Sequence, residues 1–240
     1  MKDKILVLGQ SESSRHFTEM CKKEGIEIGL LKSAAEADSC FEKFGIVVEF
    51  QDGKTEIAAV APIDYLEKTQ LWLSESVDKS VTEMACMFNK SERFIGFSLS
   101  GLYPEKKFVE LIAGELTEDD ALSAAKELFE RMQFTVVVSQ DRAGHVVDRV
   151  VASMINEAVY VNMYGLAKME DIDQMMRLGA NFPMGPFEYA DFLGLDRVLK
   201  TLEWLTEELG SQYRPCPLLK RKVEAGFLGR KTKRGFYIYQ

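Results

Sequence analysis

The sequence is poor in the residues that most often build metal sites and disulfide frameworks. Only two histidines, His16 and His145, occur among its 240 residues, and its four cysteines are scattered without any CxxC spacing. This distribution predicts neither a structural metal nor a disulfide network, and scattered reduced thiols are typical of cytoplasmic proteins. We therefore expect a cytoplasmic protein without a metal site.

Long apolar runs and an excess of positive charge are also missing. No stretch approaches the roughly 20 apolar residues that a membrane-spanning helix needs, and the opening MKDKILVLGQ lacks the features of a secretory signal. The chain carries 30 Lys and Arg against 38 Asp and Glu, a net charge of −8. Nucleic acid is disfavoured as the main partner, because phosphates bind basic surfaces. We expect a soluble globular protein that binds neither a membrane nor nucleic acid.

Short apolar runs alternate with helical stretches over the first 140 residues. The strand candidates are 5–8, 28–31, 46–48, 71–73, 94–97 and 135–138. Runs of this kind are typical of parallel strands buried on both faces, and their alternation with helices predicts a doubly wound α/β domain. One of these helices is expected to begin at Thr117, whose hydroxyl would cap the acidic first turn.

The pattern changes after Asp141, and no further strand is indicated before the last few residues. Helices are expected over 146–164, 169–178, 187–193, 196–209 and 217–225. We therefore place a domain boundary near residue 140. The sequence predicts an α/β domain over 1–140 and an all-α domain over 141–240.

Several short motifs follow one another in the second half at a characteristic spacing. They are Asp141-Arg142-Ala143-Gly144, Asn156-Glu157-Ala158, Glu170-Asp171-Ile172-Asp173, Pro183-Met184-Gly185-Pro186-Phe187, Gly194-Leu195-Asp196 and Leu228-Gly229-Arg230-Lys231-Thr232. In this order they resemble the C-terminal domain of 3-hydroxyacyl-CoA dehydrogenases. The resemblance implies a shortened Rossmann-like domain of the NAD-binding type before it, a homodimer formed through the helical domain, and acyl-CoA as a possible ligand. Asp171 and Asp173 are interpreted as first-turn charges that suit the dipole of their own helix.

The family oxidises a 3-hydroxyacyl thioester by passing hydride to NAD, with a histidine as base and a glutamate that orients it. By resemblance, Glu110 stands at the position of the glutamate, but Ser98 stands where the histidine is expected. An imidazole exchanges protons near neutral pH, whereas a serine hydroxyl needs another base to activate it. The replacement predicts a large loss of the family's usual proton transfer.

A serine and an asparagine hold the substrate oxygens in this family. By resemblance, the serine's position falls at Val77, with Ser76 beside it, and the asparagine's position falls at Asp148. An ionised aspartate only accepts hydrogen bonds, so it would repel a developing alkoxide. His145 takes the place of an apolar aromatic residue, and we expect it to pack rather than to react.

The loop after the first strand keeps one of the three glycines of a dinucleotide-binding fingerprint. Gly9 remains, Ser11 and Ser14 replace the other two, and Glu12 adds a negative charge. Lys32 stands where the acidic ribose-binding residue of the family is expected. About a dozen residues separate Lys32 from the next strand, where the family carries a helical insertion that contributes to CoA binding.

These replacements favour a divergent homologue that serves as a dimeric binding or scaffolding protein, without the standard oxidation and without a firmly assigned cofactor. The alternative is an active NAD(P)-dependent 3-hydroxyacyl-CoA dehydrogenase of fatty-acid or butanoate metabolism with atypical site residues, which would use NAD(H). A third hypothesis is an enzyme without nicotinamide, in which Glu110 and Asp148 divide the acid and base roles.

Overall fold

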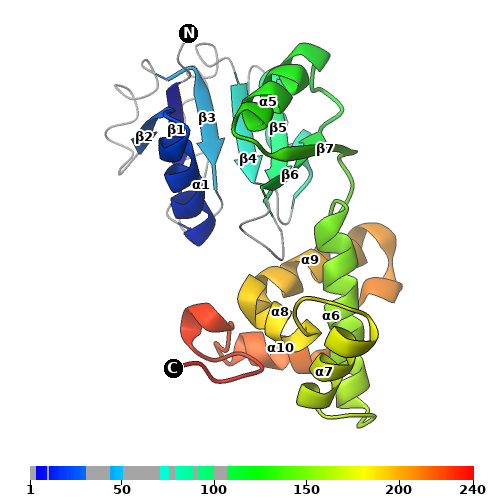
Figure 1. Cartoon of the computed structure of the whole chain (residues 1–240). Helices are drawn as coiled ribbons and strands as arrows, with labels where there is room; N and C mark the ends of the chain where they lie inside the picture. The colour runs from blue at the N-terminus through cyan, green and yellow to red at the C-terminus, as the bar shows by residue number, and fades with distance from the viewer. Residues whose placement is uncertain are drawn as a thin grey trace. The chain divides into compact units, whose positions relative to one another are not determined.

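The computed structural model describes residues 4–9, 11–30, 44–50, 71–75, 79–88, 91–99 and 107–240. The chain divides into two compact units, Met1–Arg142 (unit 1) and Ala143–Gln240 (unit 2) (Figure 1). Three of the predicted site residues, Lys32, Ser76 and Val77, lie outside the described residues.

The described residues of unit 1 form a seven-stranded sheet with the order β2-β1-β3-β4-β5-β6-β7. The strands are β1 (Lys4–Leu8), β2 (Glu27–Leu30), β3 (Ile46–Glu49), β4 (Leu71–Glu75), β5 (Phe94–Ser98), β6 (Phe108–Ala113) and β7 (Thr135–Gln140). All neighbouring strands are parallel except β5 and β6. The strand order reverses at β1, as it does in doubly wound sheets, and this confirms the predicted fold class.

Two features of the sheet differ from the sequence prediction. The strand β6 was not predicted, and it runs antiparallel to β5 because the connecting segment is too short for the crossover that a parallel neighbour needs. The prediction that 135–138 is buried on both faces is wrong, since Val137 and Val138 are 46% and 44% exposed. β7 pairs only with β6 in the described sheet, so β7 lies at an edge.

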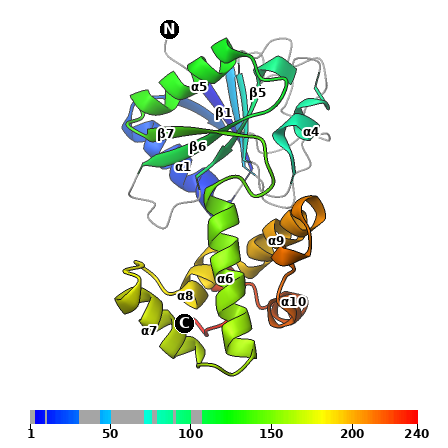
Figure 2. The same ribbon diagram turned by 90° about the vertical axis from the view of Figure 1, so that its right-hand side faces the viewer.

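Helices cover both faces of this sheet. α1 (Glu12–Lys23) and α5 (Asp119–Arg131) pack on one face, and α4 (Val81–Ala85) packs on the other (Figure 2). A short 3-10 turn, η3 (Ser91–Arg93), precedes β5. The apolar face predicted for α5 is buried, as expected for an amphipathic helix on a sheet.

The start of α5 corrects another prediction. Glu118 is the N-cap residue, and it makes no capping hydrogen bond through its side chain. The Thr117 hydroxyl instead donates to the carbonyl oxygen of Phe94 at 3.0 Å and accepts from the Gly114 backbone N–H at 3.0 Å. Thr117 therefore holds the turn before α5 against β5, a contact between residues distant in sequence.

Unit 2 is helical, as predicted, with helix ends within two residues of the predicted ones. Its helices are α6 (Val147–Met163), α7 (Met169–Gly179), α8 (Pro186–Leu193), α9 (Leu195–Leu209) and α10 (Pro217–Glu224), with 3-10 turns η4 (Ser211–Tyr213) and η5 (Arg230–Thr232). The long helix α6 buries Ala152, Ile155 and Val159 at helical spacing against the other helices of the unit (Figure 1).

Two buried aspartates connect distant segments of unit 2. Asp173 accepts hydrogen bonds from the Phe187 backbone N–H at 2.8 Å and from the Tyr237 hydroxyl at 2.9 Å. Asp191 accepts from the Phe236 backbone N–H at 2.8 Å. The expectation that Asp173 serves the dipole of its own helix is therefore wrong, because its carboxylate caps the start of α8. Burial raises the pKa of Asp173 despite these hydrogen bonds.

Candidate active site

The carboxyl ends of β1 and β3 meet where the strand order reverses, the usual position of ligand sites in doubly wound sheets. Gly9 follows β1 with a φ of 91°. A Cβ atom on Gly9 would lie 2.2 Å from the carbonyl oxygen of Phe50, just after β3. A side chain would thus meet backbone atoms and require a strained left-handed conformation. The close approach of the two loops requires this glycine whether or not a nucleotide binds.

The first turn of α1 is closed by its own serines. The Ser11 hydroxyl accepts a hydrogen bond from the Ser14 backbone N–H at 3.1 Å, and the Ser14 hydroxyl donates to the Ser11 carbonyl oxygen at 2.9 Å. In a three-glycine loop, the free N–H groups of this turn face the pyrophosphate. Here one of them is already bonded, and the buried Ser14 fills the third glycine position. These residues do not fit a dinucleotide in the family's standard manner.

Ser98 and Glu110 lie side by side on the adjacent strands β5 and β6 of unit 1. Ser98 ends β5 and pairs directly with Glu110 on the antiparallel strand β6. Directly opposed residues have Cβ atoms about 5 Å apart and project from the same face. Both side chains are buried, with 1% and 2% exposure. A carboxylate beside a hydroxyl can accept its proton, so the structure brings together a possible proton-transfer pair.

A second buried carboxylate lies on the same face of the sheet and was missed by sequence reasoning. Glu49 ends β3, and its Oε2 atom accepts hydrogen bonds from Ser74 at 3.0 Å and from the Trp72 indole at 3.4 Å. The strand register and the alternation of side chains place Glu49 and Ser74 on the face that carries Ser98 and Glu110. The sequence feature that could have indicated this site is a charged residue, Glu49, at the end of an otherwise apolar strand.

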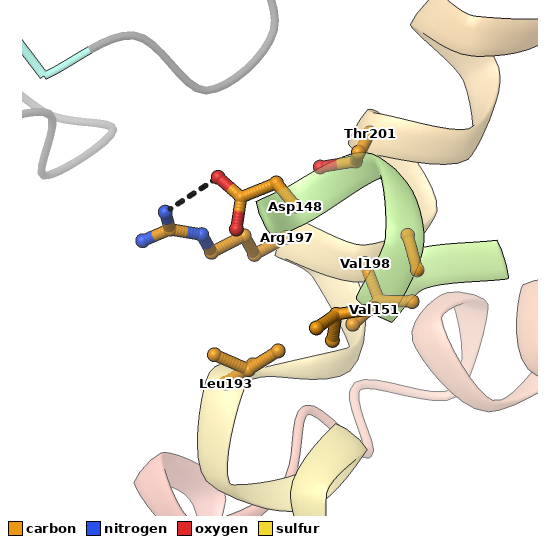
Figure 3. Close-up of a pocket in the computed structure, with 7 residues that line it drawn as sticks. Asp148, Val151, Leu193, Arg197, Val198 and Thr201 are labelled. Carbon is orange, nitrogen blue, oxygen red and sulfur yellow. Dashed lines mark hydrogen bonds and ion pairs between the residues drawn. The ribbon is translucent and has the colours of Figure 1, made fainter. Parts of the chain in front are cut away.

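Asp148 lies in the first turn of α6 and lines a small pocket in unit 2 (Figure 3). The rest of the lining is Val151, Ala152, Leu193, Arg197, Val198 and Thr201. The Arg197 Nη2 atom lies 3.2 Å from Asp148 Oδ2, and the two side chains are 20% and 7% exposed. The repulsion expected from an ionised aspartate is therefore offset by a neighbouring guanidinium. Sequence reasoning missed Arg197, although it directly follows the Gly194-Leu195-Asp196 motif.

His145 belongs to the packing of unit 2. Its ring is 5% exposed and stands edge-on to the Trp204 ring, with centroids 5.6 Å apart and an interplanar angle of 73°. This geometry is a preferred aromatic arrangement. The packing role that we expected for His145 agrees with the structure.

Cysteine and metal chemistry find little support in the described residues. Cys21, Cys86 and Cys216 are free thiols, and burial raises the pKa of Cys21 to about 12. Cys21 is therefore a thiol rather than a nucleophilic thiolate near neutral pH. The described residues contain no cluster of three or more His, Cys, Asp or Glu that could hold a metal ion. Among the described helices, none is long and apolar enough to cross a membrane.

A doubly wound sheet with a buried polar pair on its adjacent strands β5 and β6, followed in the chain by a helical unit, defines the architecture of a two-domain Rossmann-type dehydrogenase. Comparison with known proteins identifies the family. The family described as 3-hydroxyacyl-CoA dehydrogenase, C-terminal domain, matches residues 144–239. A probable 3-hydroxyacyl-CoA dehydrogenase of Caenorhabditis elegans is 30% identical over 214 residues, 87% of this chain and 67% of that protein. The chain belongs to the 3-hydroxyacyl-CoA dehydrogenase family.

Two further proteins are similar to this chain over different shares of its length. The 3-hydroxybutyryl-CoA dehydrogenase of Bradyrhizobium diazoefficiens is 46% identical over 168 residues, which cover 70% of this chain and 57% of that protein. The crystal structure of (S)-3-hydroxybutyryl-CoA dehydrogenase from Ralstonia eutropha is similar with a TM-score of 0.76 and 27% identity, and the match covers 100% of both chains. The chain thus spans little more than half the length of the Bradyrhizobium relative.

Proposed function

We propose that the chain is an oxidoreductase of the 3-hydroxyacyl-CoA dehydrogenase type with altered site residues, acting on 3-hydroxyacyl-CoA or 3-ketoacyl-CoA thioesters. The main support is its 46% identity over 168 residues to a protein named 3-hydroxybutyryl-CoA dehydrogenase. By the same likeness, we propose NAD(H) as the coenzyme to test first. We also propose a cytoplasmic location and a place in fatty-acid metabolism.

Ser98 and Glu110 are the residues to which we assign the proton transfer. In the oxidation direction, the proton of the substrate's 3-hydroxyl passes to Ser98 Oγ, while the Ser98 proton passes to the Glu110 carboxylate. The buried, directly opposed positions of the two residues support this assignment. A serine hydroxyl cannot accept a proton without a base behind it, and Glu110 provides that base. The oxidation also requires a hydride acceptor, and because the first turn of α1 does not fit a dinucleotide in the standard manner, nucleotide binding is measured separately below.

A dimeric binding or scaffolding protein without this oxidation is the second candidate. The closed first turn of α1 favours it, because the Ser14 backbone N–H is bonded to Ser11 rather than free for a phosphate. The replacement of the family's histidine by Ser98 favours it too. The first candidate requires measurable binding of a nicotinamide nucleotide, and the second does not.

The deciding experiment is the reduction of acetoacetyl-CoA by NADH, and separately by NADPH, followed by the loss of nicotinamide absorbance. We expect Glu110→Gln and Ser98→Ala each to lower kcat by about 100-fold or more, the usual contribution of general acid–base catalysis. Glu115→Gln is the matched control, because this side chain is 72% exposed in the same unit. Thermal melting of each variant verifies that it is folded.

The outcomes separate the two candidates. Turnover by the wild type that falls in both variants, with Glu115→Gln unchanged, supports the oxidoreductase. Turnover that survives in Ser98→Ala and Glu110→Gln would remove the pair from the mechanism. No turnover, together with no heat of binding for NADH, NADPH or acetoacetyl-CoA in isothermal titration, would replace the first candidate by the second.

We also propose that the chain forms a homodimer through unit 2. This unit exposes several large apolar side chains, among them Val150, Tyr164, Leu166, Met175 and Leu178, which are 55% to 77% exposed. We infer that these side chains contribute to an interaction surface, because large exposed apolar patches are typical of such surfaces. Light scattering of the purified chain should give twice the 27.2 kDa mass. Leu178→Glu should shift the protein toward monomer, and a wild-type monomer would overturn the proposal.

A further inference from the structure

Residues 214–240 of unit 2 differ in charge from the rest of the chain. Eight of the 30 Lys and Arg residues lie in this segment, together with one of the 38 acidic residues. The segment therefore carries a net charge of +7, whereas residues 143–213 of the same unit carry −6. Surface ion pairs, such as that of Lys231 with Asp196 at 2.6 Å, offset only part of this excess. Unit 2 thus concentrates its positive charge in one segment.

Two arginines of this segment are held by aromatic rings. The Arg234 guanidinium carbon lies 3.9 Å from the centroid of the Phe227 ring. The Arg230 guanidinium carbon lies 5.3 Å from the Phe192 ring centroid and 5.7 Å from that of Tyr239. Both arginines are exposed. A guanidinium that lies over a ring keeps its N–H donors in its own plane, where they can bind a carboxylate through two hydrogen bonds.

The turn that carries these arginines is fixed by the interior of unit 2. Arg234 forms one antiparallel β-bridge with Gly229 and another with Ile238. Behind the turn, the buried Asp191 accepts a hydrogen bond from the Phe236 backbone N–H at 2.8 Å. A segment that is already ordered loses less conformational entropy when it binds a partner. The turn is therefore suited to binding.

An apolar side chain lies beside the charged turn. Directly opposed residues of antiparallel strands project from the same face, so Ile238 lies next to Arg234. Ile238 is 81% exposed. Protein interfaces are enriched in arginine and combine apolar contacts with polar ones around them. The turn offers both kinds of contact at one place.

We propose that a basic turn on unit 2 is a docking surface for an acidic segment of another protein. This basic turn consists of Arg230, Lys233, Arg234 and Ile238. Carboxylates of the partner accept hydrogen bonds from the two stacked guanidiniums, and an apolar side chain of the partner contacts Ile238. The inference goes beyond the proposed function, because it uses none of the residues to which the reaction is assigned.

The charge distribution favours a short acidic segment over an extended polyanion. Nucleic acid and anionic membranes present negative charge over an area much wider than one turn. The acidic remainder of unit 2 would repel such a surface, since charges interact over about 10 Å at ordinary salt concentrations. A protein segment with a few carboxylates can contact the basic turn alone.

Fluorescence anisotropy of labelled peptides measures this interaction with the full chain. One peptide consists of glutamate and leucine residues, and its counterpart has glutamine in place of every glutamate. We expect the acidic peptide to bind about 10- to 100-fold more tightly, the equivalent of one hydrogen bond to a charged group. This preference should fall as the salt concentration rises, because the ion pairs are exposed.

Three double variants locate the binding. Arg230→Gln with Arg234→Gln removes both stacked guanidiniums and should abolish the preference. Lysine at both positions keeps the charge without the paired donors, so part of the preference should remain; this variant also keeps the proposal testable if the glutamine variant does not fold in thermal melting. The matched control is Lys4→Gln with Lys126→Gln, which lowers the net charge equally through side chains of unit 1 that are 46% and 52% exposed. The control should keep the full preference.

Three results would overturn the inference. The first is equal binding of the two peptides by the wild type. The second is a loss of preference in the control as complete as in the glutamine variant, which would assign the binding to net charge. The third is tighter binding of a thymidine oligonucleotide or of phosphatidylserine vesicles than of the acidic peptide, abolished by Arg230→Gln with Arg234→Gln. None of these results bears on the turnover of acetoacetyl-CoA, so the proposed function stands or fails separately.

Discussion

The Asp141→Asn substitution changes one oxygen of a carboxylate that connects β7 to the start of α4. Asp141 accepts hydrogen bonds from the Ser80 hydroxyl at 2.6 Å, from the Val81 and Thr82 backbone N–H groups at 3.0 and 2.8 Å, and from the Thr82 hydroxyl at 2.8 Å. Burial raises the pKa of Asp141, but the hydrogen bonds from Ser80, Thr82 and Val81 together outweigh it and hold this pKa below its ordinary value.

The expected magnitude follows from the two backbone donors. Val81 N–H reaches Asp141 Oδ1, and Thr82 N–H reaches Oδ2. An asparagine has only one acceptor oxygen, so its amide group must face one of these N–H groups. Losing a hydrogen bond to a charged group costs about 1.5–3 kcal/mol, and an unsatisfied buried donor costs about 1–3 kcal/mol more. Since such terms are not fully additive, we expect the free energy of unfolding of unit 1 to fall by about 3 kcal/mol.

Tryptophan fluorescence during urea unfolding measures this effect in unit 1. Trp72 and Trp204 are the two tryptophans of the chain, and they lie in different units. A Trp204→Phe background therefore reports on unit 1 alone. The matched control is Asp120→Asn, whose 61% exposed side chain pairs with Arg93 at the surface. Such surface pairs contribute little, so the control should remain within about 0.5 kcal/mol of its parent.

The pH dependence of the stability difference between the wild type and Asp141→Asn tests this explanation. Because the folded-state pKa of Asp141 is lowered, its ionised form adds stability that is fully present above the unfolded pKa of about 3.9. This contribution is lost as the pH falls through the folded pKa. The difference between the wild type and Asp141→Asn should therefore be constant near neutral pH and shrink in acid. A difference below about 1 kcal/mol at neutral pH, or one that persists in acid, would refute the reasoning.

Three other substitutions test two close steric contacts and one hydrogen bond. Gly185→Ala places a Cβ atom 2.3 Å from the Asp173 side chain, and we expect it to destabilise unit 2 by about 2 kcal/mol in chemical unfolding; an unchanged midpoint would contradict this. Tyr237→Phe removes a 2.9 Å hydrogen bond to Asp173 and should cost about 1 kcal/mol in the same assay. Gly9→Ala should destabilise unit 1 without any nucleotide present, because its Cβ atom meets the Phe50 carbonyl oxygen; a loss of nucleotide binding at unchanged stability would contradict a structural role.

Several motifs recognised in the sequence have structural roles that the sequence could not specify. The Asn156 side chain donates to the Arg214 carbonyl oxygen at 3.0 Å and accepts from the Cys216 backbone N–H at 2.8 Å. It therefore fastens the segment before α10 to α6. The order of the motifs indicated the family. It could not show these hydrogen bonds, because both partners of Asn156 lie far along the chain from it.

Part of the candidate site could be predicted from the sequence. Ser98 and Glu110 were identified by family position alone, and the antiparallel pairing of β5 with β6 then placed them opposite one another. Glu49 was missed, because a single glutamate at the end of an apolar strand resembles a solvent-facing strand end. Arg197 was missed because its significance depends on Asp148, which lies on another helix.

The sequence by itself determined the segments that form β1 to β5, β7 and the helices of unit 2, but it did not indicate β6. The runs of apolar residues and their period decide those features locally. Only the tertiary structure decided that β6 runs antiparallel to β5, that Asp173 caps α8 rather than its own helix, and that Arg197 meets Asp148. Each of these depends on contacts between residues distant in sequence, and the energy of a hydrogen bond or ion pair exists only when folding has brought both partners together.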